Sequence, residues 1–205
     1  MTNPWSDREA RIKAARRKKV FRRSALAAVA ILIAVGAIFA LSRYVRAPAG
    51  GLGETLSDQG QDHAPLGTAF AYNSNPPASG PHFTSPANWG VYDYEVNDQI
   101  FLHNLEHGGI WISYRPSVPA DAVEELKAIA EEFGNSKIVM APRSANDADI
   151  AIVAWTRVRK FDIPTERLTD QQKNDIRNFY KAYKNRGPEF VPDTAPGIDP
   201  KSAQR

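Results

Sequence analysis

The sequence predicts an α+β fold: a mixed or antiparallel sheet with two helices packed on one face, preceded by a single N-terminal transmembrane helix. Three observations lead to this expectation. Residues 24–42 are apolar and uncharged, several later segments are rich in β-branched and aromatic residues, and two segments carry apolar residues at helical spacing. The expected order after the membrane segment is strand–strand–helix–strand–strand–helix, which is typical of an α+β domain.

Residues 24–42 are long enough to cross a bilayer, because 19 residues at about 1.5 Å each span roughly 28 Å. Nine of the 26 basic residues lie within the first 23 positions, which places the N-terminus in the cytoplasm and the C-terminal domain outside it. A cleaved signal peptide is the alternative, since residues 47–49 read Ala-Pro-Ala. The length of the apolar run, with Arg43 and Arg46 before that cleavage site, favours an uncleaved single-pass anchor in the cell membrane.

Composition divides the rest of the chain. The residues after the anchor are rich in glycine and polar side chains, as in a linker, and the C-terminal residues are polar and contain prolines. Five segments are therefore expected: a basic cytoplasmic segment (1–23), the transmembrane helix (24–42), a flexible linker (43–62), an extracytoplasmic α+β domain (63–190) and a disordered tail (191–205).

Charge and cysteine content exclude several classes of function. The formal charge of +3 comes from the N-terminal segment, and the chain after residue 23 is net acidic, without a basic patch that would indicate a nucleic-acid partner. The chain contains no cysteine, so disulfides, thiolate catalysis and cysteine-ligated metals are excluded. The expected partners are the lipid bilayer, through residues 24–42, and a metal-accepting or membrane protein.

Four segments are expected to form the sheet, because they are rich in β-branched and aromatic residues. They comprise residues 100–102, 109–114, 137–141 and 149–156, with residues 68–72 as a further short candidate. The loop between residues 141 and 149 is short and polar. It predicts that residues 137–141 and 149–156 pair as antiparallel neighbours.

Two segments are expected to form helices. Residues 121–133 place apolar side chains on one face and acidic ones on the other, and Gly134 follows as a stop. Residues 169–183 carry an apolar face that includes Ile176 and Phe179. Both helices are expected to pack on the same face of the sheet.

Three of the four histidines lie in two distinctive stretches. His82 ends the proline-rich stretch YNSNPPASGPH, and His103 and His107 belong to HNLEHGG. His103 and His107 are four residues apart. On a helical turn this spacing puts their imidazoles on one face, with Cβ atoms about 5–6 Å apart, whereas on a strand the two imidazoles lie too far apart to share one ion easily. Asn104 and the Gly108-Gly109 pair favour a turn that interrupts the strand region.

These stretches, with a preceding DH-x-P and a following M-A-P-R, resemble the bacterial membrane-anchored family catalogued as domain of unknown function 3105. The resemblance covers roughly residues 60–190 and implies a single-pass anchored, extracytoplasmic domain. It implies little about chemistry. The residues that match the family pattern are His63, His82, His103, Glu106 and His107.

The set His82, His103, His107 and Met140 predicts a transition-metal site. Imidazole and thioether ligands suit copper(I) or copper(II), whereas three imidazoles with water or Glu106 suit zinc. Because the ligation uses no thiolate and is expected outside the cytoplasm, copper is the first expectation and zinc the alternative. The expected role is metal handling or delivery rather than catalysis.

Two alternatives stay open. His103, Glu106 and His107 spell H-x-x-E-H, a metallopeptidase motif in which the glutamate acts as general base, and Glu189 would supply the distant ligand. That motif needs a sustained helix, and the strand-like neighbours and the glycine pair argue against one here. The other alternative is a metal-free, membrane-tethered interaction domain whose histidines are structural.

Overall fold

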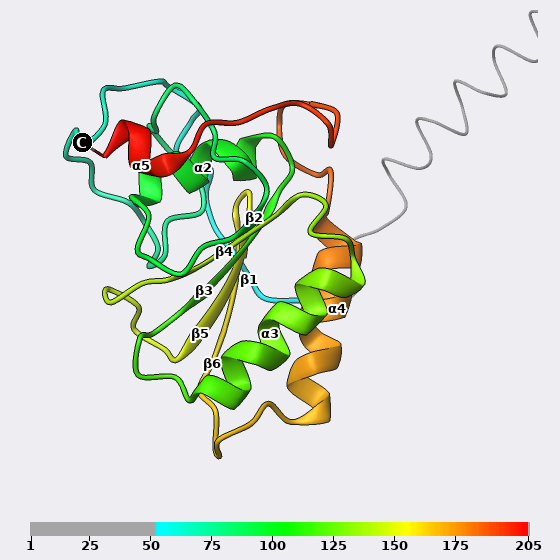
Figure 1. Ribbon diagram of the computed structural model, residues 1–205. Helices are drawn as coiled ribbons and strands as arrows, with labels where there is room; N and C mark the ends of the chain where they lie inside the picture. The colour runs from blue at the N-terminus through cyan, green and yellow to red at the C-terminus, as the bar shows by residue number, and fades with distance from the viewer. Residues whose placement is uncertain (1–51, 205) are drawn as a thin grey trace, which may run out of the picture. The chain divides into compact units, whose positions relative to one another are not determined.

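The computed structural model describes residues 52–204, which form a mixed six-stranded sheet with helices on both faces (Figure 1). The predicted cytoplasmic segment and transmembrane helix lie outside the described residues. Within residues 52–204, no helix is both long and apolar enough to cross a membrane. The elements are β1 (Glu54–Thr55), β2 (Gly90–Val91), α2 (Asp98–Glu106), β3 (Ile110–Tyr114), α3 (Ala120–Glu132), β4 (Ile138–Pro142), β5 (Ile150–Ala154), β6 (Arg157–Phe161), α4 (Asp170–Tyr183) and α5 (Pro200–Ala203).

The sheet has the strand order β1-β6-β5-β3-β4-β2 and confirms the prediction of a mixed sheet. β3 lies between β4 and β5, parallel to the first and antiparallel to the second. The expected direct pairing of residues 137–141 with 149–156 is therefore wrong. The loop between β4 and β5 instead crosses the end of β3, where Arg143 N donates to Tyr114 O and Arg115 N donates to Asp149 O, both at 2.8 Å.

Alternating residues of the central strands build two apolar clusters on opposite faces of the sheet. One face packs against α3 and α4, as predicted for those two helices, and its buried residues include Ile112, Met140 and Ile152. The other face packs against α2, and includes Val139 and Val153. The result is a three-layer arrangement with α2 opposite α3 and α4 (Figure 1).

The prediction of a strand at residues 100–102 is wrong, because these residues belong to α2. Asn97 caps the helix, with its side chain accepting a hydrogen bond from Gln99 N, and Asp98 lies in the first turn. Every residue from Gln99 to Glu106 is buried. A helix that is buried on all sides has no solvent-exposed face, so a short apolar run within it resembles a strand.

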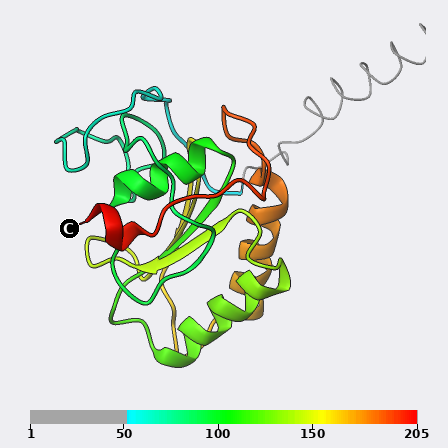
Figure 2. The same ribbon diagram turned by 45° about the horizontal axis from the view of Figure 1, so that its top comes forward.

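Segments on both sides of residues 63–190 contact the domain. In the predicted linker, β1 pairs with β6, and Asp58 accepts a hydrogen bond from Trp155 Nε1 at 3.0 Å. In the predicted disordered tail, Ile198 N donates to Pro86 O at 2.9 Å and α5 follows. The C-terminal segment lies beside α2 in both views (Figure 1 and Figure 2). Residues 68–72, expected to be a strand, form a loop.

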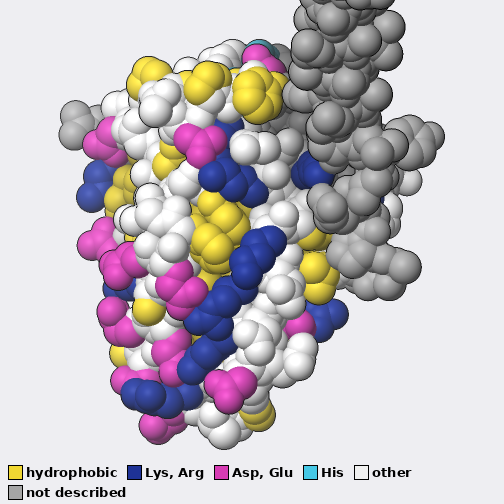
Figure 3. All heavy atoms as spheres, turned by 90° about the vertical axis from the view of Figure 1, so that its right-hand side faces the viewer, with side chains coloured by type: hydrophobic (Ala, Val, Ile, Leu, Met, Phe, Trp, Pro, Cys, Tyr) yellow, Lys and Arg dark blue, Asp and Glu magenta, His cyan; other side chains and the backbone are white. Residues whose placement is uncertain are grey.

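The side of the molecule that carries α3 and α4 shows a row of Lys and Arg side chains with Asp and Glu beside them (Figure 3). Ion pairs connect the elements there. Arg177 of α4 pairs with Glu132 of α3 at 2.5 Å, and Lys173 of α4 pairs with Glu125 of α3 at 2.9 Å. These two ion pairs therefore connect α3 and α4.

Candidate metal centre

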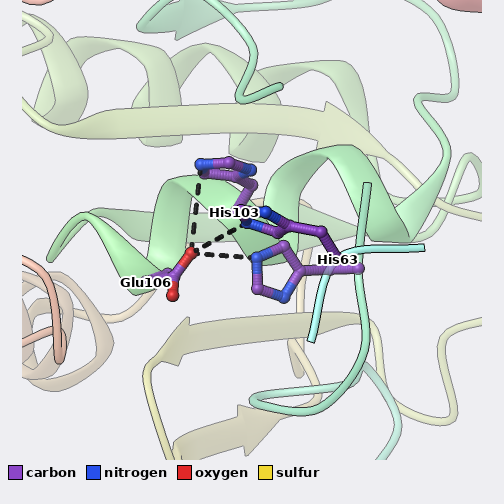
Figure 4. A group of neighbouring side chains, drawn as sticks. His63, His103 and Glu106 are labelled. Carbon is purple, nitrogen blue, oxygen red and sulfur yellow. Dashed lines mark hydrogen bonds and ion pairs between the residues drawn. The ribbon is translucent and has the colours of Figure 1, made fainter. Parts of the chain in front are cut away.

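The C-terminal half of α2 presents the central residues of the site. His103 and Glu106 are three positions apart on this helix and point to the same side (Figure 4). His63 and His82 come from two loop segments that run side by side. His82 N donates to Asp62 O at 2.9 Å and Ala64 N donates to His82 O at 2.8 Å, which brings the two imidazoles together.

Backbone carbonyls select the tautomer of two imidazoles. His82 Nδ1 lies 2.8 Å from Gly80 O, and His103 Nδ1 lies 2.7 Å from Phe83 O. A carbonyl oxygen only accepts, so both Nδ1 atoms carry the proton and donate it. In the neutral rings the Nε2 lone pairs are therefore free and face the centre of the site, as in metal-binding histidines.

Three imidazoles converge on one carboxylate oxygen. Oε2 of Glu106 lies 3.0 Å from His82 Nε2, 3.6 Å from His63 Nε2 and 3.9 Å from His103 Nε2 (Figure 4). A tetrahedral ion with bonds of about 2.0–2.2 Å holds its ligand atoms roughly 3.3–3.6 Å apart. These four residues each offer a ligand atom, and the four atoms lie within 4.8 Å of one another, so the group could hold a metal ion.

Burial keeps the imidazoles of α2 in the form that binds metals. Burial, with smaller contributions from the neighbouring histidines, lowers the pKa of His103 to about 4, against the opposing effect of the bond to Phe83 O. Burial also lowers the pKa of His107, although Glu189 and Glu106 act in the opposite direction. His103 is thus neutral at neutral pH, with its lone pair available.

A second group overlaps the first. His107 Nε2 lies 3.0 Å from His103 Nε2 and 3.1 Å from Glu189 Oε2. Ligand atoms of His103, Glu106, His107 and Glu189 also lie within 4.8 Å of one another. Two residues, His103 and Glu106, therefore belong to both groups.

The backbone segment after α4 brings Glu189 next to His107. Asn185 N donates to Gly108 O at 2.8 Å, and Glu189 N donates to Glu106 O at 3.1 Å. The approach is so close that a Cβ atom on Gly187 would clash with the Glu106 carbonyl and the Gly108 amide. Glycine at this position is what lets the segment reach the end of α2.

Two buried polar side chains connect α2 to neighbouring backbone segments through hydrogen bonds. Lys137 is fully buried, and its Nζ donates to His107 O and Val191 O, both at 2.6 Å. The Asn104 amide exchanges two hydrogen bonds of 2.9 Å with the backbone of Ala87. Lys137 thus ties the end of α2 to the segment that carries Glu189, while Asn104 ties α2 to the loop after His82.

The structure brings the predicted ligands together only in part. His82 and His103 share the first group, and His103 and His107 share the second; neither group contains all three. Met140 does not join them, because its fully buried side chain belongs to the cluster that faces α3 and α4, on the opposite side of the sheet from α2.

The ligand set predicted from the sequence omits His63, and it includes Glu106 only in the zinc alternative. His63 matched the family pattern in its DH-x-P stretch, which was the available signal. Glu106 was expected as a ligand only in the zinc alternative, and as the general base of H-x-x-E-H, yet its carboxylate faces three of the imidazoles. The argument that H-x-x-E-H lacks a helix is also wrong, since α2 extends from Asp98 to Glu106 and His107 follows it directly.

The comparisons with known proteins identify the family. The family model described as "Protein of unknown function (DUF3105)" matches residues 63–195, which is more than half of the chain and contains all four histidines, Glu106 and Glu189. No curated protein and no solved structure matches the chain. The chain therefore belongs to the family described as "Protein of unknown function (DUF3105)".

Proposed function

We propose that this domain binds a divalent transition-metal ion between His63, His82, His103 and Glu106, and that it handles or delivers this metal. The observation that carries the proposal is the convergence of three Nε2 atoms, at 3.0–3.9 Å, on one buried carboxylate oxygen. A single proton satisfies one such contact, whereas a cation among the four atoms satisfies all of them.

The donor set favours copper(II), with zinc as the alternative. Three imidazole nitrogens and one carboxylate oxygen suit divalent ions of intermediate softness, and copper(II) binds such sites most tightly of the first-row series. A soft thioether would favour copper(I), but Met140 lies on the other face of the sheet. Three histidines with a carboxylate also fit zinc coordination.

A role in metal delivery agrees with the exposure of one ligand. The His63 side chain is 45% exposed, whereas the His82 side chain is fully buried. An ion held partly by a surface ligand can pass to a partner that displaces that ligand. We further propose that residues 24–42 anchor the domain in the cell membrane, with the metal centre outside the cytoplasm and a metal-accepting protein as its partner.

Metal titration of the full chain tests the proposal. The protein would be purified in detergent, stripped with a chelator and titrated calorimetrically with copper(II) and with zinc(II). We expect tight binding that is lost in a His82→Ala/His103→Ala variant and kept in Met140→Leu, a control of nearly conserved volume. Absence of binding by the folded wild-type protein would overturn the proposal and favour a metal-free interaction domain.

A metal-dependent hydrolase is a second candidate, because H-x-x-E-H lies at the end of a helix and Glu189 Oε2 lies 3.1 Å from His107 Nε2. Its metal would sit at the second group, where Glu189 is half-exposed and water can reach it. The test is hydrolysis of a peptide library by zinc-loaded protein. Cleavage abolished by chelator and by Glu106→Gln would support this role, and an inactive zinc-loaded protein would exclude peptide hydrolysis.

A further inference from the structure

We propose that the centre holds two metal ions, with Glu106 between them. His63 and His82 would bind the first ion, and His103, His107 and Glu189 the second. The inference rests on the proposed function, since it extends the same centre by one ion.

The tautomer of His103 prevents it from serving both groups. Its Nδ1 donates to Phe83 O at 2.7 Å, which leaves Nε2 as its single free lone pair. That lone pair lies 3.0 Å from His107 Nε2, and the His103 ring centroid lies 4.5 Å from that of His107, against 4.9 Å from that of His63 and 5.0 Å from that of His82. When two ions are present, His103 therefore belongs with His107.

The number of donors exceeds what one ion uses. Four imidazoles and two carboxylates gather in two overlapping groups, while a tetrahedral ion takes four ligands. With His103 assigned to the second ion, the first keeps two imidazoles and Glu106. The second gains two imidazoles and Glu189, so each ion has at least three protein ligands when Glu106 is shared.

The short distances between ligand atoms of the second group favour a cation between them. His103 Nε2 and His107 Nε2 are 3.0 Å apart, and His107 Nε2 is 3.1 Å from Glu189 Oε2. These separations approach the roughly 3.3–3.6 Å that ligands keep around an ion with bonds of about 2.0–2.2 Å. His103, His107 and Glu189 thus have the spacing of ligands around one ion.

Glu106 is placed to bridge. Its carboxylate belongs to both groups, its side chain is only 6% exposed, and its Oε2 faces three imidazoles. A bridging carboxylate holds two ions about 3.5–4 Å apart, the spacing of two-metal sites. The outer ligands His63 and Glu189 are 45% and 55% exposed, so both ions can be loaded from solvent.

Metal stoichiometry of the full chain tests the second ion. The protein in detergent would be loaded with zinc(II) and, separately, manganese(II), dialysed and measured by elemental analysis, with electron paramagnetic resonance of the manganese form. We expect two ions per chain and a spin-coupled manganese pair. Glu189→Gln and His107→Ala should each lower the zinc content to one ion, and Glu131→Gln, an exposed glutamate on α3, should leave it at two.

The outcomes separate the two proposals. One ion in the wild-type protein, or two ions retained in both Glu189→Gln and His107→Ala, would overturn the second ion while leaving the mononuclear centre in place. No bound ion in the folded protein would overturn both. Because Glu189 is half-exposed, its variant keeps the fold and gives a clear answer even where a histidine variant does not.

Discussion

The Nε2 atom of His82 lies 3.0 Å from the Oε2 atom of Glu106, and both side chains are buried. Since His82 Nδ1 already donates to Gly80 O, the neutral ring turns a lone pair towards the carboxylate. Two lone pairs at this distance require a proton or a metal ion between them. The same carboxylate oxygen faces His63 and His103, which is why the pair is the centre of the site.

Glu106→Gln should weaken metal binding strongly without unfolding the domain. The substitution keeps the shape of the side chain but removes the negative charge and turns one ligand oxygen into an amide donor. We expect a loss of affinity greater than the roughly 10–100-fold caused by changes outside the ligands. Competition with a chelator of known affinity measures it, with Glu131→Gln as the control. Unchanged affinity would show that Glu106 is not a ligand.

The metal-free protein should lose stability as the pH falls from about 6.5 to about 4. Burial lowers the pKa of His103 from 6.5 to about 4, so over this range the unfolded chain binds a proton that the folded chain does not. Stability from this group is fully present above pH 6.5 and is lost as the pH approaches 4, by an amount on the order of 3 kcal/mol.

Urea unfolding at a series of pH values measures this loss. A His103→Gln variant, which has no titrating group at this position, should show a flatter profile between pH 4 and 6.5. If the variant and the wild-type protein lose stability in parallel, His103 is not the group responsible.

Lys137→Met should lower the free energy of unfolding by about 2–4 kcal/mol, because it leaves two part-buried carbonyls, those of His107 and Val191, without their charged donor. It should also weaken the metal affinity of the second group, since Val191 lies two residues from Glu189. Chemical denaturation measures the first effect, and Lys181→Met, on the exposed face of α4, is the matched control. Equal stability of the two variants would contradict the buried role of Lys137.

Gly187→Ala should destabilise the protein and displace Glu189. The added Cβ meets the backbone of Glu106 and Gly108, which cannot move without disturbing the end of α2. We expect a cost above about 2 kcal/mol, in the range of overpacked sites. Gly60→Ala is a stringent comparison: it has open space around it but a positive φ, so it carries a backbone cost that Gly187→Ala does not, and no clash. Thermal unfolding should place Gly187→Ala clearly below Gly60→Ala.

Much of the fold follows from local patterns. The helix over residues 121–133 and the one over 169–183 have one apolar and one polar face, and the structure contains them as α3 and α4. The central strands β3, β4 and β5 are likewise marked by β-branched residues. By contrast, residues 100–102 of α2 were predicted as a strand, because a helix buried on all sides has no solvent-exposed face.

The candidate site was predictable to the extent that its residues carry motifs. His82, His103, His107 and Glu106 lie in stretches that the sequence marks as unusual. Met140 could not be placed, because both faces of β4 are buried and its alternation therefore carries no polar side. The face it occupies depends on which helices cover the sheet, and that is a property of the whole domain.

The sequence alone determined the α+β class, the two amphipathic helices, the central strands and the concentration of imidazoles in two motifs. Only the tertiary structure decided that His63 joins His82, that Met140 turns away and that Glu189 reaches His107. These placements depend on backbone contacts between distant segments, such as Ala64 N to His82 O and Glu189 N to Glu106 O. Every residue can form such backbone hydrogen bonds, so they leave no side-chain pattern in the sequence.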